Sequence, residues 1–202
     1  MDHEIIQSVS SLIVAATAII ATTTAVRGLT AWKKQRKWER DNELAEDHLV
    51  LLAKRRHAIS GLRDAVFSYD PKYVDENGEE VYDTELANFL GLESVYNDRW
   101  GRLYDIRSEI YAKRLIADVR WGTDLSDLLE ELFGHEQILR VEIMRYLRSR
   151  NPKNSQEMRR VSAAKMSEPS ILYKDDYDGD DYGQKYDDYA KNVERYLKQK
   201  LN

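Results

Sequence analysis

The chain has 202 residues, of which 42% are hydrophobic and 33% are charged, with 9 glycines, 3 prolines and a formal net charge of -5. High charge with few helix breakers favours an all-α fold, and the mild net charge excludes a strongly steering electrostatic field. The absence of cysteine excludes a disulfide framework, a thiolate nucleophile and a cysteine-based zinc site.

Residues 5–26, IIQSVSSLIVAATAIIATTTAV, contain no charged side chain. Because a helix rises about 1.5 Å per residue, about 20 uncharged residues cross a bilayer core of about 30 Å. A secretion signal has a basic start and a shorter apolar run, whereas this stretch follows an acidic start. The stretch therefore predicts one transmembrane anchor within residues 1–28, with a buried soluble helix as the alternative.

Basic residues and tryptophans follow the uncharged stretch directly. Lysine and arginine stay on the cytoplasmic side of a membrane, and tryptophan concentrates at its interface. We therefore expect a single-pass protein of the plasma (inner) membrane, with its N-terminus outside and its C-terminal domain in the cytoplasm. Ordinary helix packing is the alternative role of the tryptophans. The residues behind this prediction are Arg27, Trp32, Lys33, Lys34, Arg36, Lys37, Trp38 and Arg40.

Small residues recur every three or four positions within the same stretch, which places them on one helical face. In lipid, small side chains let two helix backbones approach closely, and hydroxyl groups hydrogen-bond across the interface. The pattern predicts a packing face for a second copy or for a membrane protein partner, although small residues are also common in membrane helices generally. Its members are Ser11, Ala15, Ala18, Thr22 and Ala25.

Residues 29–66 are predicted to form a basic juxtamembrane stalk and a first amphipathic helix. The helix can continue directly from the span, because no proline intervenes. His48 and Arg55 fall on its apolar side. We interpret them as a hydrogen-bonded core histidine and an arginine whose stem packs while its head reaches water. A buried polar pair or a pH-sensitive contact is the alternative.

Residues 67–85 are predicted to form an acidic loop, because they contain the turn-forming pairs Asp-Pro and Asn-Gly. A small β-hairpin around Asn77-Gly78 is the alternative, and an isolated hairpin is only marginally stable in water.

Three further helices are expected within a bundle region at residues 86–166. The first runs from Thr84 to about Trp121 and ends at Gly122, and the second starts at Thr123-Asp124 and ends before Asn151-Pro152. A shorter helix covers residues 155–166. No helix can bury its apolar side alone, so we expect an antiparallel bundle of three or more helices.

Residues 167–202 form an acidic, tyrosine-rich tail. Helical spacing from Tyr186 onward predicts a terminal amphipathic helix, preceded by a mobile acidic linker. The run from Asp176 matches a calcium-binding loop poorly, since Asp181 stands where glycine is needed. A basic cluster at residues 140–165 is interpreted as a solvated surface or as the docking site of this tail, with anionic lipid or nucleic acid as the alternative ligand.

His135-Glu136 begins like a zinc-protease motif, but Leu139 occupies the place of the second histidine. We interpret Glu131 and His135 as an ion pair on a helix surface. The sequence has no phosphate-binding glycine loop, nucleophile elbow or dinucleotide fingerprint. No catalytic, cofactor-binding or metal-ligating residue is predicted, and no cofactor is expected.

The run WKKQRKWERDNELAEDHLVLLAKRRHAISGLRDAV, residues 32–66, resembles a group of uncharacterised bacterial single-pass membrane proteins with a cytoplasmic helical domain. The segments DRWGRLYDIRSE and VRWGTDL are similar to the later part of the same group, so the resemblance covers residues 5 to about 150. It implies a membrane-anchored helical protein, and it implies no activity and no site residues.

Together these features predict a non-catalytic interaction or scaffold protein at the membrane, acting as a homo-oligomer or with a membrane protein partner. One alternative is an oligomeric pore or membrane-perturbing effector, in which Thr17, Thr22, Thr23 and Thr24 line a wet path. The other is a membrane-tethered metal-dependent enzyme. Nucleic acid is not an expected partner, and the sequence does not specify a small-molecule substrate.

Overall fold

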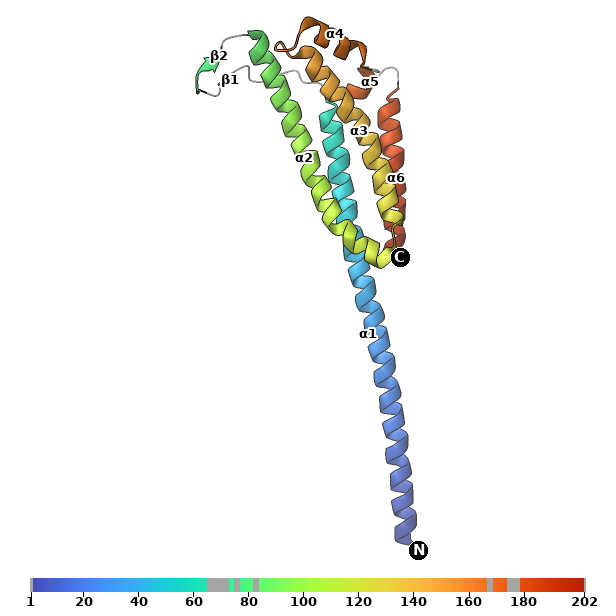
Figure 1. Cartoon of the computed structure of the whole chain (residues 1–202). Helices are drawn as coiled ribbons and strands as arrows, with labels where there is room; N and C mark the ends of the chain where they lie inside the picture. The colour runs from blue at the N-terminus through green and yellow to red at the C-terminus, as the bar shows by residue number, and fades with distance from the viewer. Residues whose placement is uncertain are drawn as a thin grey trace. The chain divides into compact units, whose positions relative to one another are not determined.

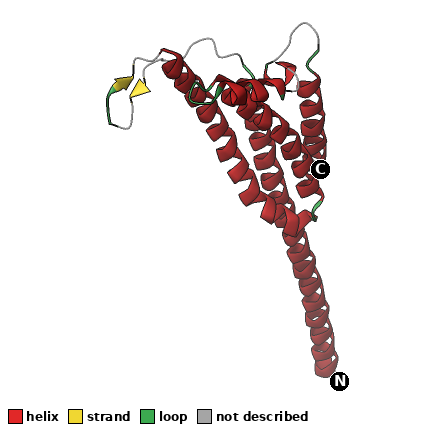
Figure 2. Ribbon diagram, turned by 45° about the horizontal axis from the view of Figure 1, so that its top comes forward, coloured by secondary structure: helices red, strands yellow, loops and turns green. Residues whose placement is uncertain are grey.

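A computed structural model describes the backbone of residues 2–64, 73–74, 77–81, 84–166, 169–173 and 179–201. Within these ranges it contains six helices and one short hairpin (Figures 1 and 2), so the all-α prediction is confirmed. The helices are α1 (Asp2–Leu62), α2 (Thr84–Trp121), α3 (Asp124–Arg150), α4 (Gln156–Ala164), α5 (Pro169–Leu172) and α6 (Asp181–Lys200), and the strands are β1 (Tyr73–Val74) and β2 (Glu80–Val81).

The chain divides into two compact units, Met1–Glu43 and Leu44–Asn202. Helix α1 runs through the boundary without a break, which confirms the expected continuous helix. Among the described side chains, which begin at residue 16, no helical stretch reaches the length and apolar character that a membrane crossing requires. The side chains at positions 5–15 of the predicted span lie outside that set.

The side chains of residues 16–40 in the first unit are all exposed. They include large apolar groups, with Ile19 and Ile20 each 67% exposed. The hydroxyl groups of Thr22, Thr23 and Thr24 each donate to the carbonyl oxygen four residues earlier, at 2.8, 2.8 and 2.9 Å. The helix therefore satisfies these three polar groups within its own backbone.

The second unit is a helical bundle in which α3 contacts α2, α4, α5 and α6. The part of α1 from Leu44 onward belongs to the same unit and lies beside α2 and α3 in both views (Figures 1 and 2). Apolar residues at three- and four-residue spacing put one face of each long helix in the core. The fully buried members include Leu62 of α1, Leu103 and Ile110 of α2, Leu125, Leu132 and Leu139 of α3, and Ala190 and Leu197 of α6.

Helix boundaries follow local chemistry that the sequence displays. Gly122 adopts φ +81°, a left-handed conformation that glycine takes at low cost, and its N–H donates to the Asp118 carbonyl at 3.1 Å. The short connection makes α2 and α3 antiparallel neighbours, as predicted. The predicted start of α3 at Thr123-Asp124 is confirmed, since Thr123 occupies the N-cap position, but its side chain makes no capping hydrogen bond. Ser155 does cap α4, because its Oγ accepts from the Met158 N–H at 3.2 Å.

The predicted acidic loop contains a short antiparallel hairpin, which was the less favoured alternative. Tyr73 pairs with Val81 and Val74 pairs with Glu80. Gly78, at φ +84°, supplies the left-handed turn residue that such a hairpin needs. Residues 67–72, 75–76 and 82–83 of this segment lie outside the described residues.

The terminal helix is confirmed, but it starts at Asp181, five residues before the predicted start at Tyr186. Residues 181–185 are therefore helical and not part of a linker, and residues 174–178 lie outside the described residues. The physical reason is a cap, because Asp180 Oδ1 accepts the Gly183 N–H at 2.8 Å. The acidic composition of this segment suggested a linker, and the sequence analysis therefore did not identify Asp180 as a helix cap.

Candidate functional site

A buried ion pair joins α1 to α3 inside the bundle. Arg55 and Glu136 are each 1% exposed. Arg55 Nε donates to Glu136 Oε1 at 2.6 Å, and its Nη2 donates to Oε2. Its Nη1 donates to the Leu103 carbonyl at 3.3 Å, and the guanidinium lies over the Phe133 ring, 4.4 Å from the ring centroid. The prediction that the head of Arg55 reaches water is therefore wrong. Arg55 lies in a buried polar pair, but its partner is Glu136, which the sequence analysis did not identify.

Helix α6 completes the surroundings of this ion pair. The Tyr186 hydroxyl donates to Glu136 Oε1 at 3.4 Å. Burial raises the pKa of Glu136 above its usual value, and the hydrogen bonds and charge of Arg55 offset only part of this rise. Burial, followed by the nearby Glu136 charge, raises the pKa of Tyr186, so its hydroxyl keeps its proton and remains a donor. The cluster links three helices through groups that are shielded from water.

His135 packs against α6, and it does not lie on the surface. Its ring stacks on Tyr182, with centroids 4.3 Å apart and an interplanar angle of 17°. Its Nε2–H donates to the Tyr182 carbonyl at 3.0 Å. Burial lowers its pKa, because desolvation disfavours the charged imidazolium. The predicted surface ion pair with Glu131 is wrong, since α6 covers His135 while Glu131 stays exposed.

The acidic tail docks on two arginines at the end of α1, Arg56 within the helix and Arg63 directly after it. Arg63 forms a fork with Asp180, with Nη1···Oδ2 and Nη2···Oδ1 both at 2.6 Å. Arg56 contacts Glu194 at 3.1 Å and Asp187 at 3.6 Å. Docking on the basic cluster of residues 140–165 is therefore not observed within the described residues. The apolar face of α6 packs into the core, and this orientation places the acidic side chains of α6 beside α1.

The interpretation of His48 is confirmed. The side chain is buried in α1, and its Nδ1–H donates to the Leu44 carbonyl at 2.8 Å. Desolvation is the main cause that lowers its pKa. His48 is therefore a hydrogen-bonded core histidine whose neutral form the fold favours.

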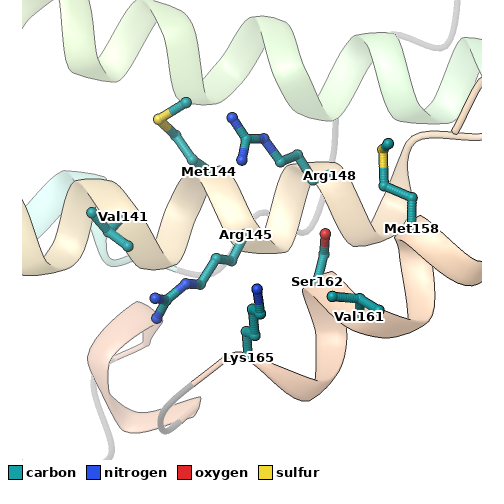
Figure 3. Close-up of a pocket in the computed structure, with 8 residues that line it drawn as sticks. All are labelled: Val141, Met144, Arg145, Arg148, Met158, Val161, Ser162 and Lys165. Atoms are coloured by element: carbon teal, nitrogen blue, oxygen red, sulfur yellow. The ribbon is translucent and has the colours of Figure 1, made fainter.

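A surface groove, named here the α3–α4 groove, lies between the second half of α3 and α4 (Figure 3). It has a volume of about 710 Å³. In Figure 3, Arg145 of α3 and Lys165, directly after α4, extend into the space between the two helices. Apolar and basic side chains line it together: Val141, Met144, Arg145, Arg148, Met158, Val161, Ser162 and Lys165.

A second groove of about 440 Å³ lies between α1 and α2. Its exposed basic members are Lys54, His57 and Arg102. Arg99, which also lines it, donates to the Asp64 carbonyl at 2.6 Å. One of its basic groups is therefore already held by the fold.

The residues predicted for the membrane helix belong to the first unit. Ala18, Thr22 and Ala25 of the predicted packing face are exposed, whereas the side chains of Ser11 and Ala15 lie outside the described set. The basic and tryptophan residues of 27–40 are likewise exposed. The packing and interface roles of these residues stay predictions.

Sequence reasoning missed the partners of Arg55 and the α3–α4 groove. One signal for the first is visible in the sequence, because Glu136 lies four residues after Leu132 and three before Leu139, on the apolar face of its helix. An acid on one apolar face and an arginine on another indicate a buried pair. A groove between two helices has no comparable signal in either helix alone.

Among the residues described, no three or more histidine, aspartate or glutamate side chains gather closely enough to hold a metal ion. Residues 176–178, the first three positions of the run compared with a calcium-binding loop, lie outside those residues. No protein-family model, curated protein sequence or solved structure matches the chain.

Proposed function

We propose that this protein is a membrane-anchored interaction protein, with the N-terminal part of α1 in the bilayer and the helical bundle of Leu44–Asn202 as its cytoplasmic scaffold. The observation that carries the proposal is the uncharged stretch of residues 5–26. Its described polar groups support the same conclusion, because Thr22, Thr23 and Thr24 donate to their own helix backbone. Lipid tolerates a helix whose polar groups are satisfied internally.

The flanking residues support the orientation with the N-terminus outside. Trp32 and Trp38 are exposed apolar rings with a polar edge, as membrane interfaces favour. Arg36 lies over the Trp32 ring at 5.7 Å from the centroid, so a positive charge stands beside an aromatic anchor. The acidic residues Asp2 and Glu4 precede the span, and the basic residues follow it.

The bundle supports a scaffold role more than a catalytic one. Two of its buried arginines are engaged in contacts that join separate parts of the bundle, namely Arg55–Glu136 between α1 and α3 and Arg63–Asp180 between the residues that follow α1 and precede α6. Such contacts favour one fixed arrangement of the helices. The hydrogen bonds of the threonines weigh against the pore alternative, because hydroxyls that donate to the backbone are less available to water.

Self-association through the predicted packing face forms part of the proposal. Ala18 and Ala25 are small and exposed on the first unit, which permits close approach of a second helix. Native mass spectrometry of the full chain in mild detergent tests this. A multiple of 23.6 kDa is expected, and a monomer mass that Ala18→Leu leaves unchanged would remove the packing face from the proposal.

Extraction of isolated membranes tests the anchor. The full chain is expected to resist alkaline carbonate and to dissolve in detergent. Ile19→Arg with Ile20→Arg should release it, because each arginine near the centre of a span costs about 2.5–3.5 kcal/mol. Leucine at the same two positions is the matched control. Release of the unmodified chain by carbonate would overturn the proposal.

Cysteine labelling tests the orientation without background, because the chain contains no cysteine. Asp2→Cys should react with a membrane-impermeant maleimide on intact cells. Ser155→Cys, in the bundle, should react only after the cells are opened. The reverse pattern would contradict the proposed orientation.

A further inference from the structure

We propose that the α3–α4 groove binds an acidic amphipathic helix of a partner protein. This inference rests on the proposed scaffold function and specifies the chemistry of the partner. Three observations carry it: apolar side chains that the fold leaves uncovered, basic groups that the fold leaves unpaired, and the position of the groove in the bundle.

The apolar floor of the groove comes from two helices. Val141 and Met144 of α3 are 44% and 43% exposed, and Met158 and Val161 of α4 are 52% and 45% exposed. Each pair is three residues apart, so both members lie on the same face of their helix. No residue of α4 is buried, so the contact of α4 with α3 leaves the apolar face of this amphipathic helix about half exposed. Methionine adapts to varied apolar partners, which suits a helix-binding groove.

The charges of the groove select an acidic ligand. Arg145, Arg148 and Lys165 line it, and none of its lining residues within the described part of the chain is acidic. Arg145 is held by Glu142 at 2.6 Å. The side chains of Arg148 and Lys165 form no ion pair or hydrogen bond with any other described residue, and both are exposed. Carboxylates beside an apolar face on the partner would therefore meet two unpaired cations.

Three other basic residues of the same cluster have partners, whereas the side chains of Lys153 and Arg160 form no ion pair or hydrogen bond with any other described residue. Arg140 lies over the Trp100 ring and Arg150 over the Tyr146 ring, at 5.6 and 5.5 Å from the centroids. Arg159 pairs with Glu85 at 3.1 Å. Among the described residues, two of the four unpaired cations of the cluster, Arg148 and Lys165, thus line the groove where the apolar floor is exposed. This combination of charge and exposed apolar surface distinguishes the groove from a surface that carries charge alone.

The size and position of the groove fit a helix better than a lipid headgroup. Residues 141–148 and 158–165 each span about 12 Å at about 1.5 Å per residue, which is about two helical turns. Asp47 and His48 contact Lys113 and Trp121, so the end of the bundle near Leu44 lies at the junction of α2 and α3. The groove lies near the other end of α3, away from Leu44, where the chain enters this unit. A partner helix reaches this end without approaching that entry.

A displayed library of amphipathic helices tests the inference. Each member carries leucine at positions i, i+3, i+4 and i+7 and random residues elsewhere. Selection uses the full chain in phosphatidylcholine nanodiscs, with empty nanodiscs to remove lipid binders. We expect the selected helices to be enriched in aspartate and glutamate beside the leucines. Failure to select any helix, or selection of neutral or basic helices, would overturn the inference.

Charge reversal then locates the site. Arg148→Glu with Lys165→Glu should weaken binding of a selected helix at least tenfold, and exchanging the glutamates of that helix for lysine should restore binding to this variant. Lys54→Glu with Arg102→Glu, in the α1–α2 groove, is the matched control and should change affinity less than twofold. Equal losses in both double variants would indicate a diffuse electrostatic effect and contradict the proposed groove.

Competition distinguishes the other occupants of the groove. Nanodiscs that contain phosphatidylglycerol should leave helix binding unchanged, and displacement of the helix would assign the groove to anionic lipid. Displacement by an excess of the full chain itself would assign it to a second copy. If carbonate extraction shows that the chain is not anchored, the same assay runs in plain buffer, so failure of the anchor and failure of the groove remain separate results.

Discussion

Replacing Glu136 with methionine would leave the Arg55 guanidinium buried without a counter-charge. Both side chains are 1% exposed, and the other contacts of the guanidinium, the Leu103 carbonyl and the Phe133 ring, carry no formal charge. Removing one partner of a buried ion pair costs about 3–5 kcal/mol. A domain is commonly stable by about 5–15 kcal/mol, so we expect a large fall in the free energy of unfolding.

Removing both charges should cost far less than removing one. In the double variant Arg55→Met with Glu136→Met, both charges of this pair are removed, and the methionine side chains retain much of the packing volume. Exchanging a buried ion pair for apolar residues is often neutral or stabilising by about 1–4 kcal/mol. The double variant is therefore expected to be more stable than Glu136→Met alone.

Urea unfolding of the full chain in nanodiscs, followed by circular dichroism, measures these differences. The partly exposed pair Lys113–Asp47, at 2.5 Å, is the matched control, and Asp47→Asn should cost less than about 1 kcal/mol. If the double variant is no more stable than Glu136→Met, the loss comes from packing and not from the stranded charge, and the reasoning is refuted.

Three further predictions concern pH, tail docking and a helix end. Burial lowers the pKa of His48 and of His135, so these two side chains bind protons less readily in the folded chain than in the unfolded chain. The free energy of unfolding should therefore fall as the pH drops below about 6.5. An equally steep fall in the His135→Gln variant would argue against this cause. Asp180→Asn removes the charge that faces Arg63 and should weaken the docking of α6 by about 1.5–3 kcal/mol. Amide hydrogen exchange should then be faster in α6 but not in α2. Unchanged exchange in α6 would contradict the docking role of Asp180. Gly122 has φ +81°, so Gly122→Ala should lower the free energy of unfolding by about 1–2 kcal/mol. Gly134→Ala, at an exposed mid-helix position, should raise it by up to about 1 kcal/mol in the same urea titration. Equal effects of the two substitutions would refute the conformational argument.

The helix ends were predictable because they depend on residues close in sequence. Gly122 ends α2 and Asn151 follows the end of α3, and both positions carry signals that act over one turn. The hairpin at Asn77-Gly78 belongs to the same class, and it was ranked below a loop only because an isolated hairpin is marginal. Local chemistry therefore sufficed for most of the fold.

The contacts between helices were not predictable in the same way. Arg55 and Glu136 are separated by 81 positions, and each helix alone shows only a charged residue on an apolar face. His135 was predicted to pair with Glu131 on its own helix, whereas Tyr182, the residue that covers it, lies 47 positions along the chain. The α3–α4 groove depends on how two helices cross, and periodicity along one helix carries no information about that.

Helices α1 and α6 contact each other in the bundle, but they are synthesised at different times. Arg56 and Glu194 contact each other across 138 positions of the chain. A ribosome adds about 5–20 residues per second, so roughly 7–28 s separate the synthesis of the two residues. Throughout that interval the apolar side of α1 that the tail will share is made but not yet covered. The number of residues between α1 and α6 therefore sets how long a chaperone is useful to this chain during synthesis. Strengthening a contact in the finished bundle would not shorten that period.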